Sequence, residues 1–243
     1  MTHTNKVIGL IDGDVIIYRA IHKSEKDKMT PNAAFDAIMK QIKMETACQD
    51  YKLHVSGKGN FRKELKQPYT IYKEKRKEKP PQFKALKEYV IKTYKPTMED
   101  GLEADDTISI EATKYLKANQ LYMLISIDKD FKNIGGLFYN LLHNNLTAIS
   151  KVDSIQFFHE QLLTGDSVDN IPGIEGVGPV KAKRILEGKN LKEQFQSVIN
   201  AYKESYKKDH RNRLEAMGKM LYLLKAANEK WTINFWKGYI KNV

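Results

Sequence analysis

Cysteine is almost absent from this sequence of 243 residues. Cys48 is the only one, so the chain can form no internal disulfide and no zinc site built from several thiolates. Long apolar runs are missing as well, because none approaches the roughly 18–20 residues that span a membrane. The N-terminus enters a strand-like run without the apolar stretch of a signal peptide. From these absences we expect a protein of the cytoplasm with no membrane partner.

Acidic residues are fewer than basic ones. The sequence has 41 Lys and Arg against 30 Asp and Glu, which gives a net charge of +11 and a pI near 9.4. Hydrophobic residues make up 41% of the chain, which suits a globular protein with one substantial core and a smaller second unit. The acids nevertheless gather in short clusters. A basic body with an acidic site is typical of a protein that binds a polyanion through metal ions.

Carboxylates cluster at the start of one predicted helix, residues 103–118, and just after one predicted strand, residues 121–127. They are Glu103, Asp105, Asp106, Asp128 and Asp130. Residues three apart lie on one helix face, so Glu103 and Asp106 should project together. Strand ends form the edge where open α/β folds place their sites. Because no His or Cys accompanies these hard oxygen donors, they suit Mg²⁺ or Mn²⁺ rather than zinc. The alternative is solvated element ends, since acids favour a helix N-terminus.

The N-terminal part repeats this pattern. A predicted strand, residues 7–11, ends in Asp12, and Gly13 then forms a tight turn before a helix. We expect Asp12 to be a metal ligand and Asp14 to cap the helix. The alternative for both is that they only form the turn.

The order of the predicted elements favours an α/β fold. Strands, helices and a further strand alternate up to about residue 127, which predicts a mostly parallel sheet with helices on both faces. From about residue 153 the pattern is all helical. We therefore expect two domains, residues 1–151 and 152–243. The loop at 56–62, with Lys58 and Arg62, lacks the spacing of a phosphate-binding P-loop and is predicted to be a basic loop at the sheet edge.

Residues 69–81 interleave cations with aromatic side chains. The segment includes Tyr72, Lys73, Lys75 and Arg76, a mixture typical of contacts with nucleic-acid phosphates. The alternative is a solvated charged helix that is stabilised by local ion pairs.

A glycine-rich hairpin precedes another predicted helix. Gly173, Gly176 and Gly178 lie ahead of Pro179, which suits the first position of a helix. Such a turn presents backbone N–H groups to a phosphate, and Lys181 and Lys183 would add charge on the same side. The alternative is a structural helix–hairpin–helix without a ligand. Just upstream, Asp166 and Asp169 form another carboxylate pair.

Five motifs occur in one order along the chain: Ile-Asp-Gly at 11–13, Tyr-Lys-x-x-Arg at 72–76, Glu-Ala-Asp-Asp at 103–106, Asp-Lys-Asp-Phe at 128–131, and the Gly-Asp segment with its hairpin at 165–178. Together they resemble the flap endonuclease and 5′→3′ exonuclease family, especially its short bacteriophage members and the 5′-nuclease part of DNA polymerase I. The resemblance covers about residues 7–187. It implies a PIN-like α/β nuclease domain, a helical arch at about 70–98, and a C-terminal helix–three-turn–helix subdomain. For a bacteriophage protein the compartment would be the host cytoplasm.

The resemblance also implies roles for matching residues. A first divalent metal would be held by Asp12, Glu103, Asp105 and Asp106. A second, weaker one would be held or oriented by Asp128, Asp130, Asp166 and Asp169. Contacts with the scissile phosphate would come from Lys73 and Arg76. The DNA-binding residues would be Lys58, Arg62, Tyr72, Lys75, Gly173, Gly176, Gly178, Lys181 and Lys183. A K⁺ ion would lie among the hairpin carbonyls, at Ile174 and Val177.

One departure from the family pattern concerns the end of the second predicted strand. The family has a metal-binding Asp there, whereas this sequence reads Val-Ser-Gly-Lys at 55–58. Either Asp14 or a water replaces that carboxylate, or the first metal binds more weakly.

These observations predict a Mg²⁺-dependent or Mn²⁺-dependent nuclease with two metal ions that cleaves DNA near a 5′ end. It would act in DNA replication as an exonuclease, a flap endonuclease or both, with RNase H activity on RNA–DNA hybrids, and as a monomer. Two alternatives remain open. A PIN-type ribonuclease would share the acidic strand ends but would not need the hairpin, and a non-catalytic DNA-structure-binding protein is suggested by the missing carboxylate.

Overall fold

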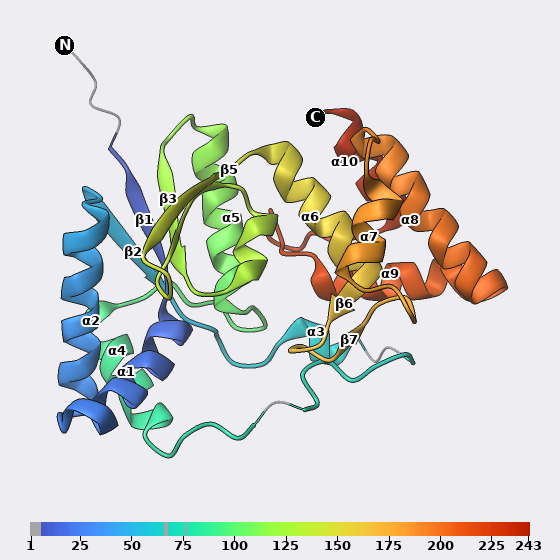
Figure 1. Ribbon diagram of the computed structural model, residues 1–243. Coiled ribbons are helices and arrows are strands. Elements are labelled where there is room, and N and C mark those ends of the chain that lie inside the picture. Colours follow the sequence, from blue (N-terminus) through green and yellow to red (C-terminus); the bar gives the residue numbers. More distant parts are fainter. Residues whose placement is uncertain (1–5, 66–67, 76) are drawn as a thin grey trace, which may run out of the picture. The chain divides into compact units, whose positions relative to one another are not determined.

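The computed structural model describes residues 6–65, 68–75 and 77–243. Arg76 and residues 1–5, for which the sequence analysis makes predictions, lie outside this description. The chain divides into two compact units (Figure 1), which are described separately. The first contains residues up to Asn60, Glu78–Phe131 and Gly136–Ala148. The second contains Phe61–Lys77, Lys132–Gly135 and Ile149–Val243.

A five-stranded sheet organises the first unit. Its strands are β1 (Ile8–Asp12), β2 (Asp50–His54), β3 (Tyr122–Ser126), β4 (Gly136–Asn140) and β5 (Asn145–Ile149). They lie in the order β2-β1-β3-β4-β5. β1 pairs in parallel with both β2 and β3, and β3 pairs in parallel with β4. The predicted mostly parallel sheet is therefore confirmed, and β1, which lies between β2 and β3, ends in Asp12.

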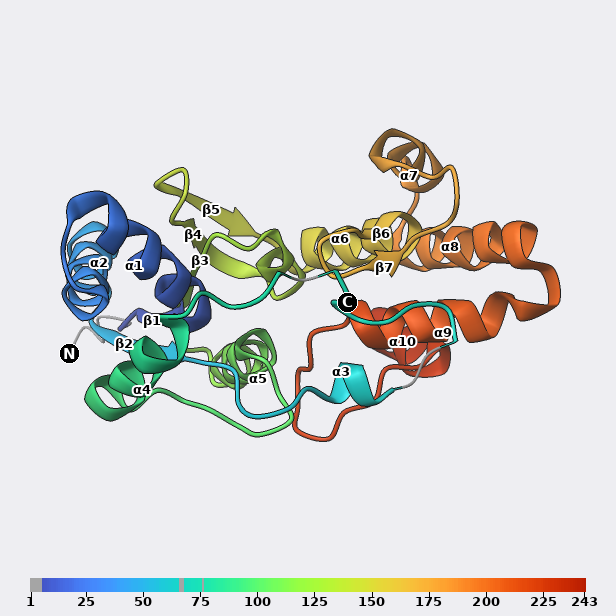
Figure 2. The same ribbon diagram turned by 90° about the horizontal axis from the view of Figure 1, so that it is seen from below.

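Helices cover this sheet through apolar side chains. They are α1 (Gly13–Asp27), α2 (Pro31–Thr46), α4 (Phe83–Tyr94) and α5 (Ala104–Lys117). The first three of these pack on one another (Figure 2) and share one core with Ile11 and Ile125. Successive strand residues point to opposite faces, so the buried neighbours Leu10 and Leu124 face the other side. There, α5 packs on β1 and β2.

The second unit is mainly helical. Its helices are α3 (Phe61–Glu64), α6 (Lys151–Thr164), α7 (Pro179–Leu186), α8 (Leu191–Tyr206), α9 (His210–Leu221) and α10 (Ile233–Lys241). The sequence predicts no strand here, but two short ones, β6 (Gly165–Asp166) and β7 (Ile171–Pro172), pair antiparallel. The 3₁₀ turns are η1 (Lys129–Asn133), which joins the two units, and η2 (Lys207–Asp209).

Aromatic rings fill the core of the second unit. Phe158 lies with its ring centroid 4.7 Å from that of Trp236 and 5.9 Å from those of Trp231 and Tyr222. The indole N–H of Trp236 donates to His159 Nε2 at 2.9 Å. Tyr222, Trp231 and Trp236 are therefore packing residues of this core.

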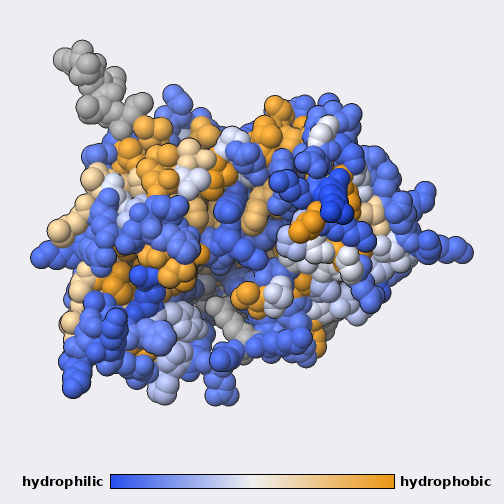
Figure 3. Space-filling view, viewed as in Figure 1, coloured by the Kyte–Doolittle hydropathy of each residue, from blue (hydrophilic) through white to orange (hydrophobic). Residues whose placement is uncertain are grey.

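Hydrophilic residues cover most of the face drawn in Figure 3, and hydrophobic ones form small patches. Among the described residues, no helix has both the length and the apolar character needed to cross a membrane.

Candidate functional site

The carboxylate of Asp12 lies at the C-terminal end of β1. It caps α1, because Oδ1 accepts a hydrogen bond from Val15 N at 3.2 Å. The other oxygen accepts from the Ser126 hydroxyl at 2.9 Å. The prediction that Asp14 caps this helix is wrong, because the extended backbone of Asp12 places it at the cap position and Asp14 is already inside the first turn.

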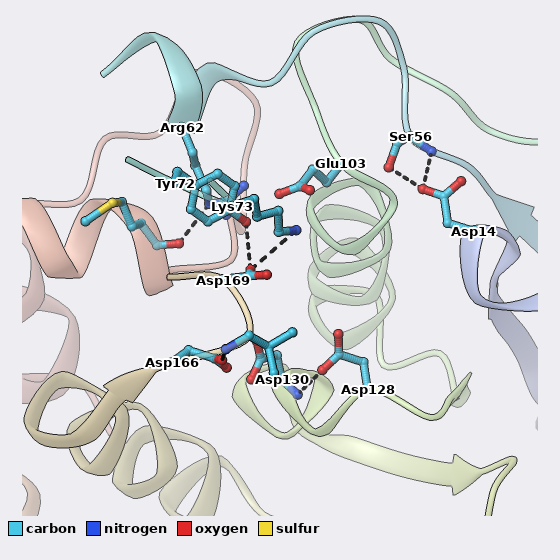
Figure 4. Close-up of polar contacts among 12 residues, drawn as sticks. Asp14, Ser56, Arg62, Tyr72, Lys73, Glu103, Asp128, Asp130, Asp166 and Asp169 are labelled. Carbon is cyan, nitrogen blue, oxygen red and sulfur yellow. Dashed lines mark hydrogen bonds and ion pairs between the residues drawn. The ribbon is translucent and has the colours of Figure 1, made fainter. Parts of the chain in front are cut away.

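Asp14 instead contacts the end of β2. Its Oδ2 accepts from Ser56 N at 3.2 Å and from the Ser56 hydroxyl (Figure 4). Gly13 makes this approach possible, because a Cβ there would lie 2.6 Å from the His54 carbonyl oxygen. Asp14 Oδ1 is buried and has no hydrogen-bond partner among the described residues. A carboxylate oxygen buried in this way favours a cation beside it.

The N-terminus of α5 is joined to the same place. Ala104 N donates to Ser56 Oγ at 3.1 Å. Glu103 and Asp106 form a capping box, in which each side chain accepts from the backbone N–H of the other. The two acids therefore lie together as predicted, and they also stabilise the start of the helix. Asp105 lies in the same first turn.

A buried histidine supports this first turn of α5. Thr107 Oγ1 donates to Ala104 O at 2.9 Å, so it accepts from His54 Nδ1, 3.0 Å away. This contact assigns the His54 ring proton to Nδ1. Burial lowers the pKa of His54 to about 4, so the imidazole stays neutral. Nothing in the sequence pattern singles out His54, since its partner is distant in the chain.

Asp128 and Asp130 follow β3. The Ser126 hydroxyl accepts from Asp128 N at 3.0 Å, and Asp128 Oδ1 accepts from Asp130 N at 2.9 Å (Figure 4). Ser126 therefore connects Asp12 to the turn that holds Asp128. Burial, the charge of Asp14 and, to a smaller extent, that of Asp128 raise the pKa of Asp12 to about 7, although bonds from Val15 and Ser126 oppose the rise.

The donors at this edge of the sheet fit a divalent cation by their chemistry. They are carboxylate oxygens, the hard ligands that Mg²⁺ and Mn²⁺ take, and their mutual repulsion would be relieved by positive charge. Among the residues that the structure describes, no group of three or more His, Cys, Asp or Glu side chains is close enough together to hold a metal ion. The fit therefore rests on the donor types and on the buried Oδ1 of Asp14.

The second unit holds the other two predicted carboxylates. Asp166, in β6, is buried, and its Oδ1 accepts from Val168 N at 2.8 Å. Asp169, in the turn before β7, accepts from the Tyr72 hydroxyl at 2.9 Å and lies 3.3 Å from Lys73 Nζ (Figure 4).

The described residues of the basic segment, 69–75 and 77–81, form turns and irregular structure and no helix. The alternative of a solvated charged helix therefore does not hold for these residues. The segment and the β6–β7 loop line a pocket of about 620 Å³ within the second unit, with Lys75 and Ser167 among its walls. Lys75 is exposed.

Two residues predicted to contact DNA have buried side chains. Arg62 is 3% exposed and donates to the carbonyl oxygens of Met220 and Tyr222 at 2.9 and 2.8 Å. Tyr72 is also buried, with Arg62 6.0 Å above its ring. Both stabilise the second unit, so we leave them out of the DNA surface. Lys58, in contrast, is exposed in its loop.

The glycine hairpin leads into α7 as the sequence predicts. Gly178 is the N-cap residue and Pro179 begins the helix. Gly176 has a φ of +71°, and a Cβ on Gly176 or Gly178 would meet nothing within 4 Å. The hairpin is closed by bonds from Ile174 N to Leu163 O and from Val177 N to Ile174 O. Gly173 lies at the base of the hairpin, where a Cβ would be 2.2 Å from the carbonyl carbon of Thr164. Lys181 and Lys183 are exposed on α7.

Comparison with known proteins now decides the family. Residues 7–160 match the family described as 5′-3′ exonuclease, N-terminal resolvase-like domain. The chain belongs to the 5′-3′ exonuclease family. The resemblance found in the sequence motifs is thereby confirmed.

Individual relatives agree with this assignment. The chain is 32% identical over 157 residues to the flap endonuclease Xni of Shewanella oneidensis, which covers 59% of this chain and 60% of that protein. It is 28% identical over 222 residues to a 5′-3′ exonuclease of Buchnera aphidicola, covering 81% of this chain and 73% of that one. The match to the Shewanella flap endonuclease thus spans about 60% of its length.

The fold is also that of a solved structure. The crystal structure of T5 D15 protein co-crystallised with metal ions aligns with a TM-score of 0.66 at 17% identity, over 98% of this chain and 99% of that one. At this identity the match establishes the fold alone, and it confirms the predicted α/β class.

Proposed function

We propose that the chain is a structure-specific 5′ nuclease that hydrolyses DNA phosphodiester bonds, as a 5′→3′ exonuclease, a flap endonuclease or both. The observation that carries the proposal is the set of carboxylates at the C-terminal edge of the parallel sheet in a member of this family. Asp12 and Asp128 meet there through Ser126, and Asp14 lies close enough to act on Asp12 electrostatically. Such a concentration of negative charge needs cations.

Two divalent ions, Mg²⁺ or Mn²⁺, are the proposed cofactors. The first would be held by Asp12, Glu103, Asp105 and Asp106, and the second by Asp128, Asp130 and Asp166, with Asp169 as a further predicted ligand. When bound, such ions stabilise the attacking and leaving oxygens and lower the pKa of the attacking water. The capping box and Ser126 would hold these carboxylates in place before an ion binds.

Asp14 is the residue that we propose in place of the missing second-strand carboxylate. Its contact with Ser56 brings it to the end of β2, where the family pattern has an Asp. Its unpartnered Oδ1 supports a role toward the first ion. A carboxylate on α1 would thus bind the first ion in the place where the family pattern has an Asp on the second strand.

The cationic residues would bind the substrate. Lys73 and Arg76 would contact the scissile phosphate and offset the charge that develops there. Lys58, Lys75 and the hairpin with Lys181 and Lys183 would hold the DNA backbone, with K⁺ on the carbonyls of Ile174 and Val177. The exposure of Lys58, Lys75, Lys181 and Lys183 supports their role in holding the DNA backbone.

The wider setting is also part of the proposal. We expect action in DNA replication on 5′ ends, flaps or nicks, and on RNA–DNA hybrids. The protein would act as a monomer in the cytoplasm, consistent with its single cysteine.

The test uses a 5′-flap duplex labelled at either end, incubated with Mg²⁺ or with EDTA. Mg²⁺-dependent products are expected, and their lengths separate flap cutting from stepwise removal of nucleotides. Preference for single-stranded RNA would favour a PIN-type ribonuclease. Tight DNA binding without any cleavage would favour the second candidate, a DNA-structure-binding protein, which the serine at position 56 suggests.

A further inference from the structure

The C-terminal end of η1 lies among buried polar groups of the second unit. Its last residue, Asn133, is 7% exposed, and Asn133 Nδ2 donates to Gln161 Oε1 on α6 at 2.6 Å. Asn133 Oδ1 is buried and has no hydrogen-bond partner among the described residues. Burial of such an amide oxygen is unfavourable unless a donor or a positive charge lies nearby.

Lys225 brings a positive charge to this place. Its Nζ donates to the backbone carbonyl of Asn133 at 3.3 Å, and both residues line a small cavity of about 10 Å³. A cation at the C-terminal end of a helical turn is favourable, because the last carbonyl groups have no partner within the turn. Lys225 therefore stabilises the end of η1.

The loop between α9 and α10 fixes the backbone from which Lys225 extends. Lys225 N donates to Glu229 Oε2 at 2.9 Å, and the same oxygen accepts from the Tyr222 hydroxyl at 2.9 Å. Tyr222 is 3% exposed and packs on Phe158 in the aromatic core. The ammonium group is thus presented to Asn133 from a rigid part of the second unit.

The charge of this ammonium depends on its surroundings. Burial lowers the pKa of Lys225 to about 8, Glu229 opposes the decrease, and the positive charge of Lys151 adds to it. The hydroxyl-bearing rings of Tyr222 and Tyr239 also line the cavity. Lys225 is therefore mostly charged at pH 7 and mostly neutral at pH 9.

The N-terminal part of η1 carries a predicted ligand of the second ion. Asp130 N donates to Asp128 Oδ1 at 2.9 Å. Phe131 is fully buried, with its ring stacked 6.4 Å from that of Phe138. Residues three apart lie on the same side of a 3₁₀ helix, so Asn133 is one turn away from Asp130. A displacement of Asn133 would therefore change the position of the Asp130 carboxylate.

We propose that Lys225 is a positioning residue for the second divalent ion, because its ammonium group fixes the carbonyl of Asn133 and with it the turn that carries Asp130. The inference rests on the proposed function, in which Asp130 is a ligand of that ion. Lys225 itself would touch neither the ion nor the DNA. Its partner Asn133 lies 92 positions earlier in the sequence, so no local pattern indicates this role.

Mn²⁺ titration of the apo protein tests the proposal without DNA. Lys225→Met removes the charge, Lys225→Arg keeps it, and Lys230→Met changes an exposed lysine nearby as a control. Loss of a group that orients a metal ligand costs about 10- to 100-fold in metal affinity. Lys225→Met should therefore weaken the second, weaker binding step by about tenfold or more and leave the first step unchanged. Lys225→Arg should recover part of this loss, and Lys230→Met should match wild type.

Several results of this titration would overturn the proposal. They are equal weakening of both steps in Lys225→Met, a second step of wild-type affinity in that variant, the same loss in Lys225→Arg or in Lys230→Met, and a single Mn²⁺ step in wild type.

Cleavage kinetics give a second readout. The Mg²⁺ concentration for half-maximal single-turnover cleavage of a 5′-flap duplex should rise about tenfold or more in Lys225→Met, while the rate at saturating Mg²⁺ stays close to that of wild type. A loss of rate that saturating Mg²⁺ does not restore would contradict a positioning role. If wild type itself shows no Mg²⁺-dependent cleavage, the proposed function fails, whereas the Mn²⁺ titration still decides the role of Lys225.

A comparison over pH keeps the proposal testable if Lys225→Met does not fold. Wild type loses the charge of Lys225 between pH 7 and 9, whereas the guanidinium of Lys225→Arg stays charged. The Mg²⁺ concentration for half-maximal cleavage should therefore rise more steeply with pH in wild type than in Lys225→Arg. Glu229, Lys151, Tyr222 and Tyr239 are common to both proteins, so their titration does not affect the comparison. Parallel pH dependences would overturn the proposal.

Discussion

At the scale of single residues, the site depends on short polar side chains that bring distant carboxylates together. Ser126 joins Asp12 to the turn of Asp128, and Ser56 joins Asp14 to the start of α5. The net contribution of one such hydrogen bond to folding stability is about 1 kcal/mol. The serines therefore fix the positions of the acids at little cost, while the repulsion between those acids remains for a cation to relieve.

The proposal that Asp14 replaces the missing strand carboxylate can be tested by moving the carboxylate from position 14 to position 56. Asp14→Asn should weaken the binding of Mn²⁺ by about tenfold or more. Adding Ser56→Asp to this variant should restore the affinity, because it returns a carboxylate to the end of β2. Isothermal titration of the apo protein with Mn²⁺ measures both effects. Unchanged affinity in Asp14→Asn would contradict the assignment.

His159 makes the stability of the second unit depend on pH. Its Nε2 accepts from Trp236, so Nδ1 carries the proton and donates to Gln194. Burial lowers the pKa of His159 to about 4, below the ordinary value of about 6.5 that it regains on unfolding. The unfolded chain therefore binds a proton that the folded one does not. Stability should fall as the pH drops from about 6.5 toward 4, by up to about 1.4 kcal/mol per pH unit.

Urea unfolding at several pH values between 7 and 5 checks this dependence. His159→Gln keeps an acceptor for the Trp236 indole but cannot titrate, so its stability should fall less steeply with decreasing pH than that of wild type. Identical slopes for the two proteins would show that His159 does not contribute.

At the scale of elements, the sequence predicted most of the regular structure. The strand before Asp12 and the helical start of the second predicted domain were found because apolar periodicity and turn residues are local signals. Their observed bounds are Ile8–Asp12 and Lys151–Thr164. The segment before Arg76 was not predictable in this way. Lys73 forms an ion pair with Asp169, which lies 96 positions later in the sequence, and no local pattern indicates such a contact.

The candidate site was predictable only in part for the same reason. The acids at strand ends are visible in the sequence, and so is the missing carboxylate at position 56. The contact between Asp14 and Ser56 depends on the close approach at Gly13, which requires the folded sheet. The burial of Arg62 likewise follows from carbonyl groups at the end of α9, far along the chain.

Two helical glycines give a test of packing between elements. A Cβ on Gly218, in α9, would lie 2.2 Å from the ring of Trp231, whereas one on Gly238, in α10, would meet nothing within 4 Å. Gly218→Ala should destabilise the protein by about 1–3 kcal/mol through overpacking. Gly238→Ala should stabilise it by about 0.5–1 kcal/mol, because alanine favours a helix. Thermal unfolding compares them, and equal effects would contradict the packing described for α9.

At the scale of the whole molecule, the net charge of +11 predicts DNA binding that weakens with salt. Each lysine that neutralises a phosphate adds about one to the slope of log Kd against log salt. Lys181→Ala and Lys183→Ala should each reduce this slope by about one. Lys40→Ala, at an exposed position of α2, serves as the control with an unchanged slope. Titrations of a flap duplex at several KCl concentrations measure this slope. Slopes equal to that of the Lys40→Ala control would show that α7 does not contact the DNA.

The family assignment and the acidic edge of the sheet together make metal-dependent cleavage the central claim. The most direct measurement compares wild type with Asp128→Asn on one 5′-flap duplex in Mg²⁺, recording both cleavage and binding. We predict that wild type cleaves, that the variant is slower by about 10³-fold or more, and that both bind the duplex with similar affinity. Cleavage by Asp128→Asn at the wild-type rate would contradict the metal site, and with it the proposed mechanism.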